Sequence, residues 1–318
     1  MTTNRWTADS IPDQRGKLAV ITGASSGIGY EAASALAARG ARVILAIRSV
    51  EKGRLAAESI RRASPGAALE VLPLDLADLA SVRGFAEAFL RRGEPLPLLI
   101  NNAGVMALPF RRTADGFEMQ FGTNHLGHFA LTGLLLPAVL AAPGARVVTV
   151  SSGAHTAGAI DFANLDGARG YQPWRAYSQS KLANLLFAYE LQRRLAAAGA
   201  DAISVGCHPG YAATNLQAAG PRMEGSRLKE AIMGAANALF AQSARMGALP
   251  TLYAATAPGV NGCDYIGPTG LGGMRGYPGK ARSSTRSYDE DTARRLWDIS
   301  EQLTGVHYEF AAPAIAAR

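Results

Sequence analysis

The sequence predicts an α/β fold, a doubly wound parallel sheet of about seven strands with helices on both faces. Two observations lead to this prediction. Short apolar runs alternate with amphipathic stretches along most of the 318 residues. The runs are apolar almost throughout, which is typical of parallel strands covered on both sides. Right-handed crossovers between such strands place ligands at their carboxyl ends.

The elements follow one another in a regular order. The first strand is LAVIT at 18–22, and the helix behind it runs through Leu36. Further strands are expected at 42–47, 69–74, 97–100, 145–150, 202–207 and 263–267, with helices at 51–62, 79–91, 113–140, 177–198 and 289–303. Trp297, in the last helix, is expected to pack in the core.

Residues 218–247 break this alternation with an amphipathic stretch rich in Met and Ala. We interpret residues 216–247 as a substrate lid inserted in a single domain that spans 1–318. Flexible apolar side chains suit ligands of variable shape, so the lid favours a hydrophobic substrate. Its apolar side chains are Met223, Leu228, Ile232, Met233, Leu239, Phe240 and Met246.

Composition and charge exclude several classes of protein. Two cysteines in 318 residues exclude a disulfide scaffold, and 48% apolar residues exclude a disordered chain. No apolar run reaches the ~18 residues of a membrane span. The polar N-terminus lacks a signal-peptide core, so we expect a cytoplasmic location. The net charge of +7 comes from scattered arginines rather than a basic patch, so no nucleic-acid partner is expected.

A glycine-rich turn at 22–29, TGASSGIG, joins the first strand to its helix. Its glycines allow a sharp turn, close approach of a pyrophosphate to the backbone, and close packing of the helix on the strand. The helix N-terminus adds free N–H groups and the positive end of its dipole. We therefore predict a dinucleotide site rather than an ordinary turn, with contacts from Gly23, Ser25, Ser26, Gly27, Ile28 and Gly29.

The end of the second strand indicates which dinucleotide binds. NAD-binding sheets of this kind carry an acidic residue there for the ribose 2′-OH, whereas here the strand ends at Ile47 and Arg48 follows. An arginine suits a 2′-phosphate. We therefore expect NADP(H) rather than NAD(H); the alternative is that Arg48 is one more surface arginine.

The sequence YSQSK places Tyr177 and Lys181 four residues apart, on one face of a helix. A phenol is a poor acid or base near neutral pH, and an ammonium one turn away lowers its pKa. The pair therefore suits proton transfer coupled to hydride transfer. Ser152, at the end of the fifth strand, is placed to donate a hydrogen bond to a substrate carbonyl.

Together these motifs resemble the short-chain dehydrogenase/reductase family, whose members have a Rossmann fold. The matching motifs lie between residue 18 and about residue 215, in the family's order: TGASSGIG, Asp75 in LDLAD, NNAG at 101–104, Asn124 in TNHLG, Ser152, YSQSK, and HPG at 208–210. The resemblance implies a catalytic tetrad of Asn124, Ser152, Tyr177 and Lys181.

The resemblance also implies a role for each of these residues. Tyr177 is the general acid and base, and Ser152 orients the carbonyl. Lys181 lowers the tyrosine pKa and holds the nicotinamide ribose, while Asn124 supports a water that feeds protons to Lys181. Further cofactor contacts are implied at Asp75, Leu76, Asn102, Ala103 and Gly104 near the adenosine, and at Pro209, Gly210 and Thr214 near the nicotinamide.

The segment before Tyr177 indicates which branch of the family the sequence resembles. It is longer than in most of the family, and it carries SS-x-x-H at Ser151, Ser152 and His155. Both features are similar to those of the retinol-dehydrogenase-like branch, in which the second serine is the active one. His155 either lines the substrate pocket with Ser152 and Tyr177 or forms a structural hydrogen bond.

We therefore expect an NADP(H)-dependent alcohol dehydrogenase or carbonyl reductase acting on a small-molecule ketone, aldehyde or alcohol. The alternatives are a non-catalytic dinucleotide sensor and an NADPH-dependent C=C reductase. His125 and His128 form H-x-x-H without a third ligand, so no metal site is expected. Cys207 and Cys263 are expected to be inert thiols. Helix-mediated homodimers and homotetramers are common in the family, so either assembly is open.

Overall fold

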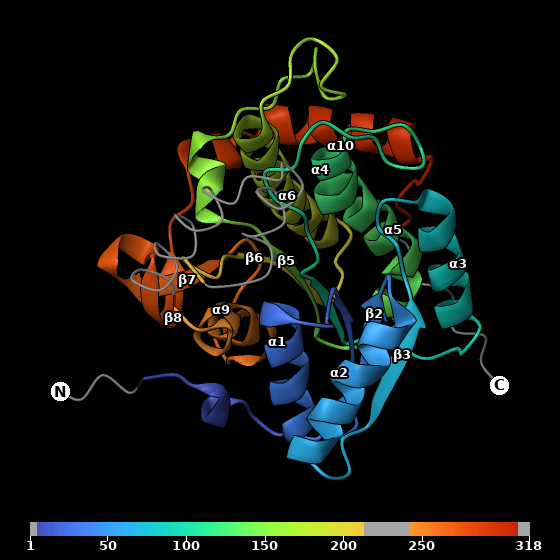
Figure 1. Ribbon diagram of the computed structural model, residues 1–318, viewed down its shortest axis with the longest axis vertical. Helices are drawn as coiled ribbons and strands as arrows, with labels where there is room; N and C mark the ends of the chain where they lie inside the picture. The colour runs from blue at the N-terminus through green and yellow to red at the C-terminus, as the bar shows by residue number, and fades with distance from the viewer. Residues whose placement is uncertain (1–4, 213–241, 311–318) are drawn as a thin grey trace.

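Figure 1 shows the computed structural model, which describes residues 5–212 and 242–310. In that part of the chain one eight-stranded sheet has the order β3-β2-β1-β4-β5-β6-β7-β8. This arrangement confirms the doubly wound sheet, with one strand more than expected. The strands are β1 (Leu18–Thr22), β2 (Arg42–Ile47), β3 (Leu69–Pro73), β4 (Leu98–Asn101), β5 (Ala145–Val150), β6 (Ala202–Cys207), β7 (Tyr265–Gly270) and β8 (Arg275–Ala281).

The additional strand, β8, departs from the expected parallel pairing, because it runs antiparallel to β7. The connection between them passes through Leu271–Gly273, where Gly272 and Gly273 both have positive φ. Glycine adopts this backbone conformation without strain. The sequence prediction ended with a strand at 263–267, since a run rich in Gly and Pro is typical of loops. Proline is tolerated in β8 because the strand lies at the edge of the sheet.

Helices cover both faces of the sheet (Figure 1). Ala19 and Ile21 of β1 belong to one apolar cluster, whereas Val20 belongs to the other. Successive residues of β1 therefore point to opposite layers, as the pleat of a strand requires. The first cluster includes residues of α1 (Gly27–Ala38), α2 (Val50–Ala63) and α9 (Ala244–Thr256), and the second includes residues of α3 (Leu79–Leu90), α5 (Gly127–Leu140), α6 (Pro173–Ala197) and α10 (Glu290–Thr304).

Two of the predicted helices differ from the structure. The stretch expected as one helix over 113–140 consists of a short helix α4 (Met119–Phe121), a π-helical turn η2 (Gly122–Leu126) and α5. Turns of this kind are frequent at functional sites, and Asn124 lies in this one. Helix α6 begins before Tyr177, at Pro173, because proline suits the first helical position, where an N–H has no partner.

Part of the predicted lid falls outside the described residues. Residues 216–241 and Thr214 belong to that part of the chain. The last four residues of the predicted lid, 244–247, begin α9, and Met246 packs there against the core. This short piece is therefore part of the helical layer.

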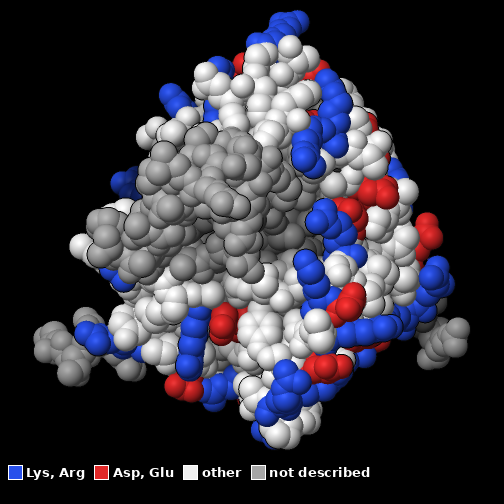
Figure 2. All heavy atoms as spheres, viewed as in Figure 1, with Lys and Arg blue, Asp and Glu red and all other residues white. Residues whose placement is uncertain are grey.

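Charged side chains of both signs share the face shown in Figure 2. Arg42 of β2 pairs with Glu94, and Arg92, which follows α3, pairs with Glu70 of β3. Such partly exposed pairs contribute little to stability. Among the described helices, none combines the length and the apolar character that crossing a bilayer requires.

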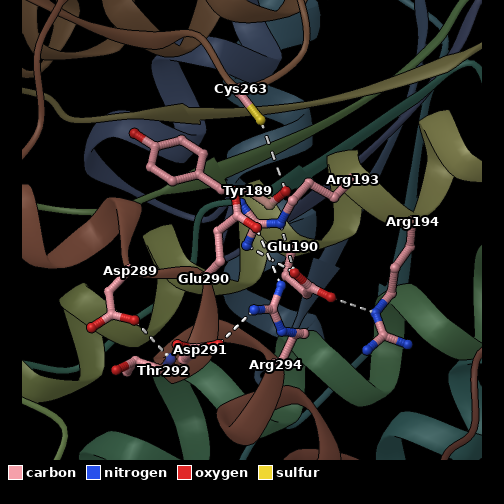
Figure 3. Close-up of polar contacts among 10 residues, drawn as sticks. All are labelled: Tyr189, Glu190, Arg193, Arg194, Cys263, Asp289, Glu290, Asp291, Thr292 and Arg294. Carbon is pink, nitrogen blue, oxygen red and sulfur yellow. Dashed lines mark hydrogen bonds and ion pairs between the residues drawn. The ribbon is translucent and has the colours of Figure 1, made fainter.

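The last helix, α10, packs against α6 through Trp297. This side chain is buried, and its ring stacks on Phe187. The Arg194 guanidinium lies 4.4 Å from the centroid of the same ring. Figure 3 shows Arg193 and Arg194 both reaching Glu190, so that this buried carboxylate is paired within α6. The expected core position of Trp297 is confirmed.

Candidate active site

The turns that follow β1 and β4 are fastened to each other at the point where the strand order reverses. The hydroxyl of Thr22, the last residue of β1, accepts the N–H groups of Asn102 and Ala103, each at 2.9 Å. The Thr22 carbonyl accepts the Asn102 side-chain amide at 2.8 Å. The NNAG turn is thereby fixed beside the glycine-rich turn, where open α/β sheets bind ligands. Thr22 was not among the residues expected to build the site, although a hydroxyl residue directly before the first glycine was a signal.

The glycine-rich turn fits a dinucleotide phosphate. Gly23 and Gly27 have φ of +69° and +57°. A Cβ on Gly29 would lie 2.5 Å from Asn102 Nδ2 and 2.6 Å from the Gly23 carbonyl oxygen, so only glycine fits there. The N-cap Ser26 makes no side-chain hydrogen bond to α1, and the first turn of α1 holds no acidic residue. Its N–H groups therefore remain available to an anion.

Arg48 is exposed directly after β2 and makes no hydrogen bond or ion pair with the described part of the chain. Within residues 5–212 and 242–310, no carboxylate competes for this guanidinium. At the end of β3, Asp75 accepts the Ala77 N–H at 3.0 Å, and Leu76 is buried. These residues follow neighbouring strands, so they lie on the same edge of the sheet as the glycine-rich turn.

Tyr177 and Lys181 are both buried on α6. The Lys181 Nζ lies 5.9 Å from the centroid of the Tyr177 ring and donates to the Val150 carbonyl at 3.1 Å. Burial lowers the pKa of Lys181 to about 8. Burial raises the pKa of Tyr177, and the Ser152 hydroxyl only partly opposes this shift. The expected lowering of the tyrosine pKa by Lys181 stays a prediction, and burial has the largest effect on the phenol in this structure. The phenol is therefore neutral and able to donate a proton.

The adjacent residues Ser151 and Ser152 have different hydrogen-bond partners. The Ser151 hydroxyl is buried and donates to the Lys181 carbonyl at 2.7 Å. The Ser152 hydroxyl accepts the Ala154 N–H at 3.2 Å. The same hydroxyl hydrogen-bonds to the Tyr177 phenol, where it opposes the rise of the phenol pKa, and this position favours Ser152 as the active serine.

The Asn124 side chain connects the NNAG segment to α6. Its Oδ1 accepts the Val105 N–H at 2.7 Å, and its Nδ2 donates to the Val105 carbonyl and to the Ser180 hydroxyl, each at 2.9 Å. Ser180 in turn donates to the Tyr177 carbonyl at 2.8 Å. The structure thus brings Asn124 and Tyr177 together through Ser180. Sequence reasoning missed Ser180, because a serine within the YSQSK motif gave no sign of its partner.

His155 and the HPG motif lie around Tyr265 of β7. His155 is buried, and its ring nitrogens contact the Ser152 carbonyl at 2.6 Å and the Ser284 N–H at 3.1 Å. Of the two roles considered for His155, this geometry favours the structural hydrogen bond. In the HPG motif, the Gly210 N–H approaches His208 Nδ1 at 3.3 Å, and the His208 ring stacks on Tyr265.

His125 and His128, the two histidines of the H-x-x-H pair, contact different elements. His125 Nε2 lies 2.9 Å from the Ser300 hydroxyl, whereas His128 contacts the Thr22 hydroxyl and the Asn124 carbonyl, each at 2.9 Å. Burial lowers their pKa values to about 3 and about 4, so both rings are neutral. His128 thereby connects the end of β1 to the π-helical turn.

Burial also affects the two cysteines. It raises the pKa of the Cys207 thiol to about 12, and it raises that of Cys263 as well. A thiol is nucleophilic only as the thiolate, so the expected inertness of both residues agrees with their surroundings.

Comparison with known proteins adds an independent line of evidence. The family model described as short chain dehydrogenase matches residues 17–225. Human retinol dehydrogenase 11 is 43% identical over 291 residues, which cover 92% of this chain and 86% of that protein. Mouse polyprenol dehydrogenase is 42% identical over 301 residues, which cover 93% of this chain and 86% of that protein. The crystal structure of an uncharacterized protein from Mycobacterium paratuberculosis has a TM-score of 0.80 at 44% identity, covering 96% of this chain and 100% of that one.

Proposed function

Since this chain belongs to the short-chain dehydrogenase family, and within it to the retinol-dehydrogenase-like branch, we propose that it is an NADP(H)-dependent oxidoreductase. It interconverts a ketone or aldehyde with the corresponding alcohol. The observation that carries this proposal is the neutral, buried phenol of Tyr177 beside the Ser152 hydroxyl and Lys181.

In the reduction, the dihydronicotinamide supplies the hydride that the carbonyl carbon receives. The Ser152 hydroxyl donates a hydrogen bond to the carbonyl oxygen and holds it near Tyr177. As negative charge develops on that oxygen, the phenol of Tyr177 transfers its proton there. The positive charge of Lys181 stabilises the phenolate that remains. Oxidation of the alcohol runs through the same residues in reverse.

The preference for NADP(H) rests on Arg48. The side chain is exposed after β2, on the sheet edge that carries the glycine-rich turn, and no described carboxylate neutralises it. A guanidinium forms charge-assisted hydrogen bonds with a phosphate. NAD(H) lacks the 2′-phosphate, so it gains nothing from Arg48.

A hydrophobic substrate is supported by the surroundings of Tyr177. Trp174 lies one turn earlier on α6 with its ring edge-on to the Tyr177 ring, at 6.0 Å between centroids, and is 53% exposed. An apolar substrate body would remove this indole from water, which is favourable. The names of the relatives, retinol and polyprenol dehydrogenase, refer to apolar alcohols.

We further propose that residues 1–318 form one catalytic domain that works in the cytoplasm.

The proposal is tested with a panel of aldehydes and ketones of increasing apolar length, each offered with NADPH and with NADH. The absorbance of the reduced nicotinamide reports turnover. We expect consumption of NADPH that rises with apolar length and exceeds that of NADH. No turnover with any carbonyl, nor with the corresponding alcohols and NADP⁺, contradicts the proposed function.

A further inference from the structure

A pair of hydrogen bonds through His155 joins the Ser152 turn to the segment that follows β8. His155 Nε2 lies 3.1 Å from the backbone nitrogen of Ser284, and Nδ1 lies 2.6 Å from the Ser152 carbonyl oxygen. A backbone N–H only donates, so Nε2 is the accepting nitrogen. Nδ1 therefore carries the hydrogen that it donates to Ser152. One neutral tautomer satisfies both neighbours, and burial lowers the pKa of His155 in agreement with the neutral state.

At its Ser284 end, the connection is held against α6. The Ser283 hydroxyl lies 2.8 Å from the Tyr189 hydroxyl and 2.7 Å from that of Ser287. Tyr288 stacks on Tyr189 with an interplanar angle of 4°. Ser284 is thus held in a segment that packs on the helix carrying Tyr177.

At its Ser152 end, the connection holds the turn that carries the active serine. Ser152 is the N-cap residue of the 3₁₀ turn Gly153–Ala157, and its hydroxyl accepts the Ala154 N–H. The Ser152 carbonyl accepts both the backbone N–H of His155, at 3.0 Å, and the Nδ1 hydrogen. Rotation of the Ser152–Gly153 peptide would move the Ala154 N–H and hence the hydroxyl. The imidazole resists this rotation.

We propose that His155 is a positioning residue, which orients the Ser152 hydroxyl by tying its turn to the Ser284 backbone. The segment after β8, which lies beyond the residues matched by the family model, thereby helps to build the active site. This inference rests on the proposed function for its kinetic consequence, and the geometry on which it stands is independent of that function.

Ser284 allows a matched pair of variants. Its φ is −67°, which is close to the value that proline fixes. Ser284→Pro therefore removes the N–H donor while keeping this φ. Ser284→Ala retains the N–H and removes only a hydroxyl that is buried without a hydrogen-bond partner in the described structure. We expect kcat for carbonyl reduction to fall by about tenfold or more in Ser284→Pro and to stay at the wild-type value in Ser284→Ala. The affinity for NADPH should change in neither variant.

Variants of His155 test the other half of the connection. His155→Ala removes both contacts, and also the 3.4 Å contact of Nδ1 with the Tyr265 hydroxyl, and should lower kcat at least as far as Ser284→Pro. His155→Asn places an amide donor near the position of Nδ1 and should recover part of the loss. His125→Ala is the control, since it removes another buried imidazole, one bound to Ser300 in the core. It should lower the melting temperature without lowering kcat in the folded protein.

NMR of the histidine side chains supplies a readout that needs no turnover. We expect His155 as a single neutral Nδ1–H tautomer in the wild type and in Ser284→Ala, and a changed state in Ser284→Pro. A wild type that shows this tautomer but reduces no carbonyl overturns the proposed function alone and leaves the connection in place. The Nε2–H tautomer in the wild type overturns the connection. Wild-type kcat in both Ser284→Pro and His155→Ala overturns the positioning role.

Discussion

Lys181 Nζ lies 5.9 Å from the centroid of the Tyr177 ring and directs its hydrogen bond to the Val150 carbonyl instead of the phenol. Burial acts on both groups and favours the neutral form of each. It raises the pKa of Tyr177 and lowers that of Lys181 to about 8. The neutral phenol of Tyr177 therefore lies beside the Lys181 ammonium, whose charge is unfavourable in this buried position.

This cost predicts the behaviour of Lys181→Met. The pKa of Lys181 is about 8 in the folded protein against an ordinary 10.5, a difference on the order of 3 kcal/mol against the buried charge. The folded state binds fewer protons between these two pH values, so the wild type should gain stability as the pH rises from about 8 to about 10.

At pH 7 the Met variant escapes this cost, and the Val150 carbonyl keeps the Asn184 amide at 3.2 Å. We expect Lys181→Met to lose turnover while its free energy of unfolding at pH 7, measured with urea, equals or exceeds that of the wild type. A variant clearly less stable than the wild type at pH 7 would show that the ammonium stabilises the fold.

Arg48→Ala tests the choice of cofactor. Hydrogen bonds to charged groups contribute roughly 1.5–3 kcal/mol, so we expect the Kd for NADPH to rise by about tenfold to a hundredfold, with little change for NADH. Arg54→Ala is the control, because Arg54 is also exposed and lies on α2, the helix that follows Arg48. Fluorescence titration with both dinucleotides measures the effect. An equal loss for NADPH and NADH would refute the contact with the 2′-phosphate.

Two glycines in helices should respond oppositely to alanine. At Gly29 a Cβ would lie 2.5 Å from Asn102 Nδ2 and 2.6 Å from the backbone oxygen of Gly23, so Gly29→Ala should destabilise the protein and weaken NADPH binding. At Gly84, exposed in α3, a Cβ would meet nothing within 4 Å. Gly84→Ala should stabilise the protein by about 0.5–1 kcal/mol, because alanine favours the helix.

Chemical unfolding of both variants measures these changes, and titration with NADPH measures the affinity. If Gly29→Ala binds NADPH as tightly as the wild type does, the close packing of the two turns is not what shapes the phosphate site.

Features that depend on local sequence could be predicted. The glycine-rich turn, Arg48 and the Tyr177–Lys181 pair all follow from spacing along one strand or helix, and the sheet follows from the apolar runs. Strand β8 was not predicted, because Pro and Gly are frequent in Arg275–Ala281. This segment is a strand because it pairs with β7, and its own residues have little strand propensity. The π-helical turn at Asn124 gave no signal, since its residues suit an ordinary helix.

The missed features of the site depend on partners far away in the sequence. Thr22 holds Asn102 across 80 residues, and His155 binds Ser284 across 129. The effect of burial on the Tyr177 pKa could not be predicted for the same reason, because the spacing of a motif does not report how deeply the helix is buried. Local motifs predict the candidate groups, whereas tertiary packing sets their protonation and orientation.

The central claim, that Tyr177 is the general acid and base, is tested most directly by Tyr177→Phe. The variant keeps the ring that packs against Trp174 and removes only the hydroxyl. Tyr253→Phe, which removes the hydroxyl from a ring that packs on Trp6, is the control. The measurement is kcat for NADPH-dependent carbonyl reduction together with the Kd for NADPH. We predict an unchanged Kd and a kcat lowered by about 10²- to 10⁴-fold in Tyr177→Phe, with both values unchanged in Tyr253→Phe. Wild-type turnover by Tyr177→Phe would contradict this claim.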